Sequence, residues 1–280
     1  MANATGKPGS ALHAVDPVWT TLREEAADIV DREPVLAGLI YASILNHDSL
    51  ESAVAHRIAD RLDHAVFGAD QIRAGFTEMF KAEPEISDAL RIDLVAVYDR
   101  DPACSRFVEP VLYFKGFHAI QNHRLANFLN RTNRPDLAYY LQSRASEVFQ
   151  VDINPAVPMG RGVFIDHATG VVVGETAVIE DDVSILQNVT LGGTGKEQGD
   201  RHPKIRSGVL IGAGANILGN LEIGKCSRVA AGSVVLADVP ANTTVAGVPA
   251  RVVGRAGCAE PSRTMDHLLR DIDDHGEESS

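Results

Sequence analysis

Two histidines beside carboxylates are the residues of this chain best suited to acid–base chemistry. His167 directly follows Asp166, and His202 ends the run Asp200-Arg201-His202. A histidine that titrates near neutral pH is the side chain best able to take a proton from a hydroxyl or amine that attacks a thioester. The two histidines therefore favour acyl transfer, with surface histidines of no function as the alternative.

The stretch 153–239 has to position these side chains, and it returns an aliphatic residue at every sixth position. The positions are Ile153, Met159, Ile165, Val171, Ala177, Val183 and Val189, and after an interruption Ile205, Ile211, Ile217, Ile223, Val229 and Val235. A period of six fits neither an α-helix nor an alternating strand. It is typical of a parallel β-helix, in which each aliphatic side chain stacks on its equivalent in the next coil.

Residue types that tolerate positive φ recur three positions after several of these aliphatic residues. They are Gly162, Gly174, Gly192, Gly208, Gly214 and Gly232, with Asn220 in the same phase. We therefore expect a sharp corner at each of them. Three hexapeptides, about eighteen residues, make one triangular coil, so stacked positions should differ by about eighteen.

A loop interrupts the repeat between Val189 and Ile205. These residues are sixteen positions apart, one hexapeptide plus ten. We expect about ten residues within 192–204 to protrude as a loop, and long excursions from a rigid repeat are more often functional than decorative. A phosphate-binding P-loop is excluded, because Gly195-Lys196 is followed by Glu197 and not by Ser or Thr.

The first half of the chain carries helical patterns. Asp48 to Glu51 predicts a capping box before a helix, and a later Asp101-Pro102 pair predicts a turn. The helix after the capping box should bury Leu50, Val54, Ile58 and Leu62. Further helical segments are expected at about 72–80, 110–128 and 135–149.

The fold class predicted from these patterns is α+β. An N-terminal all-helical domain is expected over 17–150 and a left-handed parallel β-helix over 151–255, with its protruding loop at 192–204. Residues 1–16 are expected to be disordered, and 256–280 to form a flexible acidic tail.

Composition excludes several classes of function. The net charge of −12 over 280 residues argues against a nucleic-acid or anionic-membrane surface. No apolar run is long enough to span a membrane. The three cysteines, Cys104, Cys226 and Cys258, show no CxxC spacing, so we expect neither a zinc framework nor disulfides, and a reducing cytosol.

A catalytic zinc site is the alternative chemistry for the two histidines. A trimeric β-helix can hold zinc on three histidines, as in proteins like the γ-class carbonic anhydrases. Residues 153–250 contain only His167 and His202. The zinc alternative therefore needs a third histidine from a partner subunit, and no metal is expected.

Several runs resemble the signature runs of the serine O-acetyltransferase family. In the β-helix they are 166–176 (DHATGVVVGET), 191–196 (LGGTGK) and 199–205 (GDRHPKI). Asp101-Pro102, 115–119 (KGFHA) and 149–153 (FQVDI) are similar to that family too. The resemblance covers about 17–255, and the loop and the helical domain make it specific among hexapeptide acyltransferases.

The resemblance implies transfer of the acetyl group of acetyl-CoA to the hydroxyl of L-serine, giving O-acetylserine for cysteine synthesis. It implies that His167 is the general base, oriented by Asp152, and that His202 helps to hold the oxyanion. Asp101 and Asp166 would bind the serine ammonium and Arg201 its carboxylate. Asp152 lies fifteen residues before His167, so simple stacking does not pair them. The implied contacts of acetyl-CoA are Gly193, Thr194, Ala213 and Ala231, although Ala213 and Ala231 fit corner positions equally well.

Partners follow from the same resemblance. L-cysteine should inhibit at the serine site, and the chain should form a homotrimer or a dimer of trimers with its groove between neighbouring β-helices. Many family members end in isoleucine, which binds O-acetylserine sulfhydrylase. This chain ends in Ser280, so we expect that complex to be weak or absent.

Two alternatives to serine acetylation are kept open. One is an acetyltransferase for another acceptor, such as homoserine or a sugar, and the other is a catalytically silent scaffold.

Overall fold

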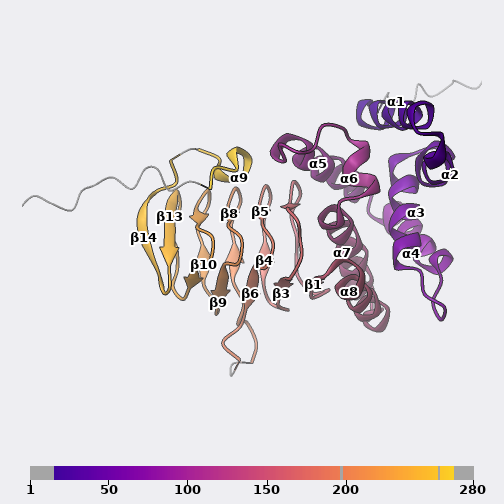
Figure 1. The fold of residues 1–280 in the computed structure, drawn as a ribbon. Helices are drawn as coiled ribbons and strands as arrows, with labels where there is room; N and C mark the ends of the chain where they lie inside the picture. Colours follow the sequence, from indigo (N-terminus) through magenta and orange to yellow (C-terminus); the bar gives the residue numbers. More distant parts are fainter. Residues whose placement is uncertain (1–15, 196–197, 258, 268–280) are drawn as a thin grey trace, which may run out of the picture.

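The computed structural model describes residues 16–195, 198–257 and 259–267. A group of helices lies against one end of a stack of short strands, and the stack leads away from the helices (Figure 1). The predictions for residues 1–15 and for Ser280 lie outside the described residues.

In the described ranges, ten helical segments precede the strands and one short helix follows them. They are α1 (Pro17–Arg32), the 3₁₀ turn η1 (Pro34–Leu36), α2 (Ala37–Ile40), the π turn η2 (Tyr41–Leu45), α3 (Leu50–Leu62), α4 (Ala69–Ala82), α5 (Glu85–Arg100), α6 (Val108–Leu112), α7 (Lys115–Arg131), α8 (Pro135–Phe149) and α9 (Pro261–Thr264). The expected helix over 135–149 is confirmed. The patterns did not single out α5, which matters most for the site.

Two helix boundaries differ from the prediction. Ser49, not Asp48, is the N-cap of α3, and its hydroxyl accepts the N–H of Ser52 at 3.2 Å. The expected helix over 110–128 is two helices, because the chain leaves helical geometry at Phe114 (ψ 109°). The guanidinium of Arg57 donates to the carbonyl of Leu112 at 2.8 Å and 3.0 Å. That carbonyl therefore needs no partner from a continuing helix.

The strands form three sheets of a β-helix. They are β1 (Val151–Ile153), β2 (Phe164–Ile165), β3 (Val171–Val173), β4 (Val178–Ile179), β5 (Ser184–Ile185), β6 (Thr190–Gly192), β7 (Lys204–Ile205), β8 (Leu210–Ile211), β9 (Asn216–Leu218), β10 (Glu222–Ile223), β11 (Arg228–Val229), β12 (Val234–Val235), β13 (Thr243–Gly247) and β14 (Ala250–Arg255). The five-stranded sheet has the order β1-β3-β6-β9-β12, the three-stranded sheet β10-β7-β4, and the six-stranded sheet β14-β13-β11-β8-β5-β2. All pairs are parallel except β13 with β14. The predicted fold class, a helical region followed by parallel sheets of hexapeptide repeats, is confirmed.

The prediction of an eighteen-residue coil with one ten-residue loop is wrong in register. Ile165 pairs with Ile185, twenty residues on, and Ile185 with Ile211, twenty-six residues on; only then does the spacing settle at eighteen, from Ile211 to Val229. Eight residues therefore leave the coil in the protruding loop. The other two are inserted at the corner 166–170, where His167 lies.

The expected corner residues that lack positive φ lie at or beside the corner that leads from the five-stranded into the three-stranded sheet. Among the residues of the described ranges, φ is positive at Gly162, Gly208, Gly214 and Gly232, as predicted, but not at Gly174, Gly192 or Asn220. Between the two insertions the corners fall elsewhere in the repeat. Positive φ occurs there at Ala168, Asp182 and Asn188.

The beginning of the expected C-terminal tail is packed on the β-helix. The backbone carbonyl of Ser262, a fully buried residue in α9, accepts the hydroxyl of Ser184 at 2.7 Å. Asp16, placed in the expected disordered segment, caps α1 and pairs with Arg91 at 2.6 Å. No helix of the described ranges is long and apolar enough to cross a membrane.

Gly116 lets the first turn of α7 approach β2 directly. A Cβ at this position would lie 1.9 Å from the carbonyl oxygen of Ile165, which is backbone and cannot rotate away. We expect Gly116→Ala to lower the free energy of unfolding by about 1–3 kcal/mol, the usual effect of overpacking, as measured by urea denaturation. Gly75→Ala is the control, since its Cβ would make an ordinary 3.4 Å contact with Leu125. Equal stability of the two variants would contradict the expectation.

Candidate active site

A pocket of about 650 Å³ lies where the helices meet the first coil. Three residues singled out in the sequence, Asp101, Asp166 and His167, line it together. The remaining lining is Val97, Pro102, Ala103, Tyr113, Phe114, Lys115, Gly116, Phe117, Phe164 and Ile165. The walls are therefore the end of α5, the start of α7 and the turn from β2 to β3, three elements that are remote in sequence.

Helix ends and the inserted corner hold the polar side chains of this pocket in place. Asp101 is the C-cap of α5, and its carboxylate accepts the N–H of Ala103 at 2.8 Å, which forms the expected turn. His167 has φ 54°, and its side chain is 72% exposed. The two extra residues at this corner therefore carry the imidazole outside the coil instead of into its core.

The carboxylates of Asp101 and Asp166 place negative charge in the lining of the pocket. Burial raises the pKa of Asp166 above its usual value, and the neighbouring carboxylate of Asp101 adds to the effect, while His167 opposes it. The imidazole Nε2 of His167 lies 3.7 Å from Oδ2 of Asp166. Two carboxylates that face one cavity attract a cation such as an ammonium group, beside an exposed histidine that can accept a proton.

Asp152 is not joined to His167 in the described part of the chain. Its register partner is Val172, and its carboxylate accepts Nε2–H of Gln142 at 2.6 Å. The fifteen-residue spacing noted in the sequence therefore remains unexplained by stacking. The expected orientation of His167 by Asp152 remains a prediction.

His202 and Arg201 lie at another corner of the β-helix. We name the corner between the six-stranded and five-stranded sheets the His167 edge (166–170, 186–189, 212–215 and 230–233). The corner between the five-stranded and three-stranded sheets is the His202 edge (174–177, 193–203 and 219–221). The seven residues from Ala168 to Gly174 cross the five-stranded sheet between them, and a chain of six residue steps spans at most roughly 20 Å. The two histidines of one chain therefore lie at different edges of the β-helix.

The ring of His202 is held in one tautomer. It is 7% exposed, and its Nδ1 accepts the backbone N–H of Thr176 at 3.2 Å. Burial lowers the pKa of His202, with the charge of Arg201 acting in the same direction, so the ring is neutral at pH 7. Because Nδ1 is the acceptor, the proton lies on Nε2, which makes that nitrogen a hydrogen-bond donor.

Arg201 is oriented at the same edge. Its guanidinium donates to the carboxylate of Glu175 at 2.8 Å, and its backbone N–H donates to the hydroxyl of Thr176 at 2.9 Å. Thr176 thus fixes both Arg201 and His202. Neither Arg201 nor His202 lines the Asp101 pocket of its own chain.

The four residues expected to contact CoA divide between the two edges. Ala213 and Ala231 stack eighteen residues apart on the His167 edge, where the carbonyl of Ala213 accepts the N–H of Gly232 at 2.8 Å. Gly193 and Thr194 lie on the His202 edge, next to Arg201. Each edge therefore carries one of the two histidines and half of the expected CoA set.

Two family profiles match the chain. One, described as "Serine acetyltransferase, N-terminal", matches residues 18–122, and "Bacterial transferase hexapeptide (six repeats)" matches 202–237. A serine acetyltransferase of Salmonella typhimurium is 53% identical over 255 residues, which are 91% of this chain and 93% of that relative. The chain belongs to the serine acetyltransferase family.

Solved structures of the family agree with this fold. Serine acetyltransferase of Brucella abortus in complex with coenzyme A is 63% identical with a TM-score of 0.87, over 89% of this chain and all of that one. A serine acetyltransferase in complex with cysteine is 49% identical with a TM-score of 0.88, over 90% of this chain and 98% of that one. The expected family, and with it an acyltransferase, is confirmed.

Lys115 is a site residue of this family member to which the sequence patterns assigned no role. It lines the pocket, and its ammonium donates to the hydroxyl of Thr169 and, at 3.4 Å, to the amide oxygen of Gln150. Lys115 thereby ties the start of α7 to the corner that carries His167. Its place in 115–119, a run that resembles the family, is the signal that could have found it. Within the described ranges, no three His, Cys, Asp or Glu residues group as a metal site.

Proposed function

We propose that this family member transfers the acetyl group of acetyl-CoA to the hydroxyl of L-serine, giving O-acetyl-L-serine and CoA. The observation that carries the proposal is the pocket that combines Asp101, Asp166 and His167. Its two carboxylates suit the ammonium of an amino acid better than a neutral sugar. A related structure with bound coenzyme A supports acetyl-CoA as the donor.

The reaction needs one base and one oxyanion donor. His167 takes the proton of the serine hydroxyl as its oxygen attacks the thioester carbonyl of acetyl-CoA. Nε2–H of His202 donates to the oxyanion of the tetrahedral intermediate. The intermediate then expels the CoA sulfur, which takes the proton from His167. Asp101 and Asp166 hold the ammonium meanwhile, and Arg201 the carboxylate.

The site is completed by a second copy of the chain. The His167 edge of one β-helix holds the base and the ammonium ligands, and the His202 edge holds the oxyanion donor and Arg201. Two edges that the five-stranded sheet separates within one chain meet only if neighbouring copies pack edge to edge. A cyclic homotrimer satisfies this with three equivalent sites, each with CoA between Ala213 and Ala231 of one copy and Gly193 and Thr194 of the other. A dimer of such trimers is the larger assembly that we also consider, and a weak or absent complex with O-acetylserine sulfhydrylase remains a prediction.

The same pocket suits L-cysteine as an inhibitor. L-cysteine carries the same ammonium and carboxylate as L-serine, and a related enzyme has been solved with cysteine bound.

A reducing cytosol is the compartment we propose, and Cys104 is a buried thiol outside any disulfide.

Release of free thiol from acetyl-CoA tests the function directly. We expect release to depend on L-serine and to be far slower with L-homoserine or N-acetylglucosamine. L-cysteine should inhibit competitively with L-serine, raising its KM and leaving kcat unchanged. Faster release with L-homoserine would assign the enzyme to another acceptor, and inhibition that L-serine does not relieve would place cysteine elsewhere.

A further inference from the structure

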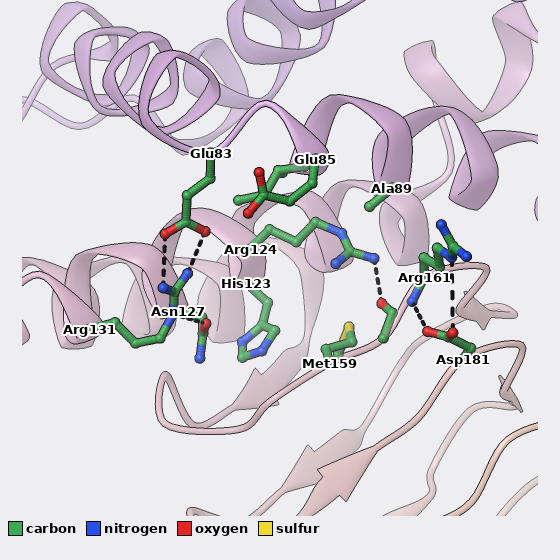
Figure 2. Close-up of a pocket in the computed structure, with 12 residues that line it drawn as sticks. Glu83, Glu85, Ala89, His123, Arg124, Asn127, Arg131, Met159, Arg161 and Asp181 are labelled. Atoms are coloured by element: carbon green, nitrogen blue, oxygen red, sulfur yellow. Dashed lines mark hydrogen bonds and ion pairs between the residues drawn. The ribbon is translucent and has the colours of Figure 1, made fainter.

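A second pocket, of about 310 Å³, lies at the junction of the helical part and the first coil, lined by none of the residues of the Asp101 pocket. It is bounded by the start of α5, the middle and end of α7, and the chain around Gly160 (Figure 2). Its polar groups come from the start of α5, from α7, from the chain after Gly160 and from the turn after β4, and the proposed reaction uses none of them.

Two of the arginines in this pocket are already neutralised. Arg131 makes a bidentate pair with Glu83 at 2.8 Å and 2.7 Å. Arg124 donates to the buried carboxylate of Asp93 and, at 2.7 Å, to the carbonyl of Gly160. Figure 2 shows the bidentate pair of Arg131 with Glu83 on one side of the pocket. Charge that can bind a ligand has to come from other residues.

One cation and one anion in the lining have unused bonding capacity. The guanidinium of Arg161 is 62% exposed, and its one contact with a described residue is a 3.9 Å approach to Asp181. The carboxylate of Glu85 makes no hydrogen bond or ion pair with any residue of the described ranges, although its charge helps to raise the pKa of Arg131. Arg161 and Glu85 lie on opposite sides of Arg124 (Figure 2).

His123 adds an unused acceptor. Its side chain lines the pocket and is 3% exposed, and Nε2 lies 2.9 Å from the carbonyl oxygen of Val157. A carbonyl only accepts, so Nε2 carries the proton. Burial lowers the pKa of His123 to about 4, which leaves Nδ1 unprotonated at neutral pH. Nδ1 is buried and has no partner among the described residues, an arrangement that proteins rarely leave unfilled.

We propose that this pocket binds a free α-amino acid with a small apolar side chain. The ligand carboxylate accepts from Arg161, and its ammonium donates to Glu85 and to Nδ1 of His123. The side chain packs on Ile86, Ala89 and Met159, the apolar part of the lining. A volume of about 310 Å³ accommodates a ligand of this size.

Binding here can reach the reaction through two helices. The first turns of α5 line this pocket, and its last residues and C-cap, Val97 and Asp101, line the other. The helix α7 also reaches both pockets. Its first residue, Lys115, lines the Asp101 pocket, and His123, further along the helix, lines the second pocket. The buried pair of Asp93 with Arg124, at 2.7 Å, joins the two helices between the pockets. An amino acid in the second pocket is thus expected to change KM for L-serine, a consequence that rests on the proposed function, whereas the binding itself does not.

Saturation-transfer NMR and calorimetry on the full chain test the binding, with L-alanine and L-valine as probes. Both probes are expected to bind saturably. Arg161→Ala and Glu85→Gln should each weaken binding tenfold or more, the usual effect of losing a charge-assisted hydrogen bond. Both side chains are exposed, so the variants should fold and retain acetyl transfer. Arg134→Ala, which removes an exposed arginine paired with Glu78, is the matched control and should bind as the unaltered chain does.

Asp101→Asn separates the two pockets. The probes are expected to bind this variant as tightly as the unaltered chain. Binding that is lost in Asp101→Asn but kept in Arg161→Ala would place the probes in the Asp101 pocket and overturn the proposal. If methylamine or acetate binds as tightly as L-alanine, the pocket is a site for a simple ion, which overturns the proposal. The absence of saturable binding of the probes would overturn it as well. If the chain binds the probes but has no acetyltransferase activity, the proposed function is disproved and the proposed amino-acid site is not.

Discussion

Replacing His167 with alanine is expected to lower kcat of acetyl transfer by about 10²–10⁴-fold, the usual contribution of a positioned general base. The imidazole is 72% exposed at the His167 edge, so its removal leaves the core of the β-helix unchanged. KM for L-serine should change little, because Asp101 and Asp166 still hold the ammonium. Steady-state kinetics with thiol detection measures both constants.

Two further variants guard this test against indirect effects. His167 has φ 54°, a conformation that asparagine tolerates better than alanine, so His167→Asn removes the base with less backbone strain. His64→Ala removes another exposed histidine, between α3 and α4, and should keep full activity. If His167→Asn folds and retains near-normal turnover, the base is another group.

The hexapeptide period predicted the β-helix because burial enforces it. Twelve of the thirteen aliphatic positions found in the sequence are buried, with only Met159 partly exposed. An inward side chain at each corner must stack on the next coil, and a polar residue there would lose its hydration. The sequence therefore shows the six-residue repeat of aliphatic residues wherever the coil is regular.

The pattern could not divide the ten extra residues between two insertions. Val171 and Val189 kept the period of six only because the β-helix has a second inward row, to which they belong. A shift of two residues moves the pattern from one buried row to the other and leaves the apolar period intact. The aliphatic period therefore could not predict the two-residue insertion at the corner that carries His167, although this insertion exposes the proposed base.

The Asp101 pocket was predictable only as a set of residue types. Asp101, Asp166 and His167 come from a helix end and a corner, and their meeting depends on the close approach of α7 to β2 at Gly116. Arg201 and His202 fall outside that pocket, because a triangular coil turns them to another edge. No pattern within one chain reveals a site divided between edges.

Gly174→Ala is expected to lower kcat by about 10²–10³-fold through His202, the usual effect of losing one oxyanion donor. A Cβ at position 174 would lie 2.0 Å from Nε2 of His202. The φ of Gly174 is not positive, so alanine fits the backbone and the imidazole has to move instead. The ring is held by Thr176, and its displacement turns Nε2–H away from the oxyanion while the coil stays folded.

A double-mutant cycle shows whether His202 carries this effect. His202→Ala alone should lower kcat about as much as Gly174→Ala, and the double variant no further, because the clash has lost its partner. Two independent effects would instead multiply, and a double variant slower than His202→Ala by the full factor of Gly174→Ala would contradict the mechanism. Urea denaturation of all three variants is the control. Since His202 and His167 lie at different edges of one chain, mixing Gly174→Ala with His167→Ala chains should restore sites with both groups intact, and kcat per chain should rise above that of either variant alone.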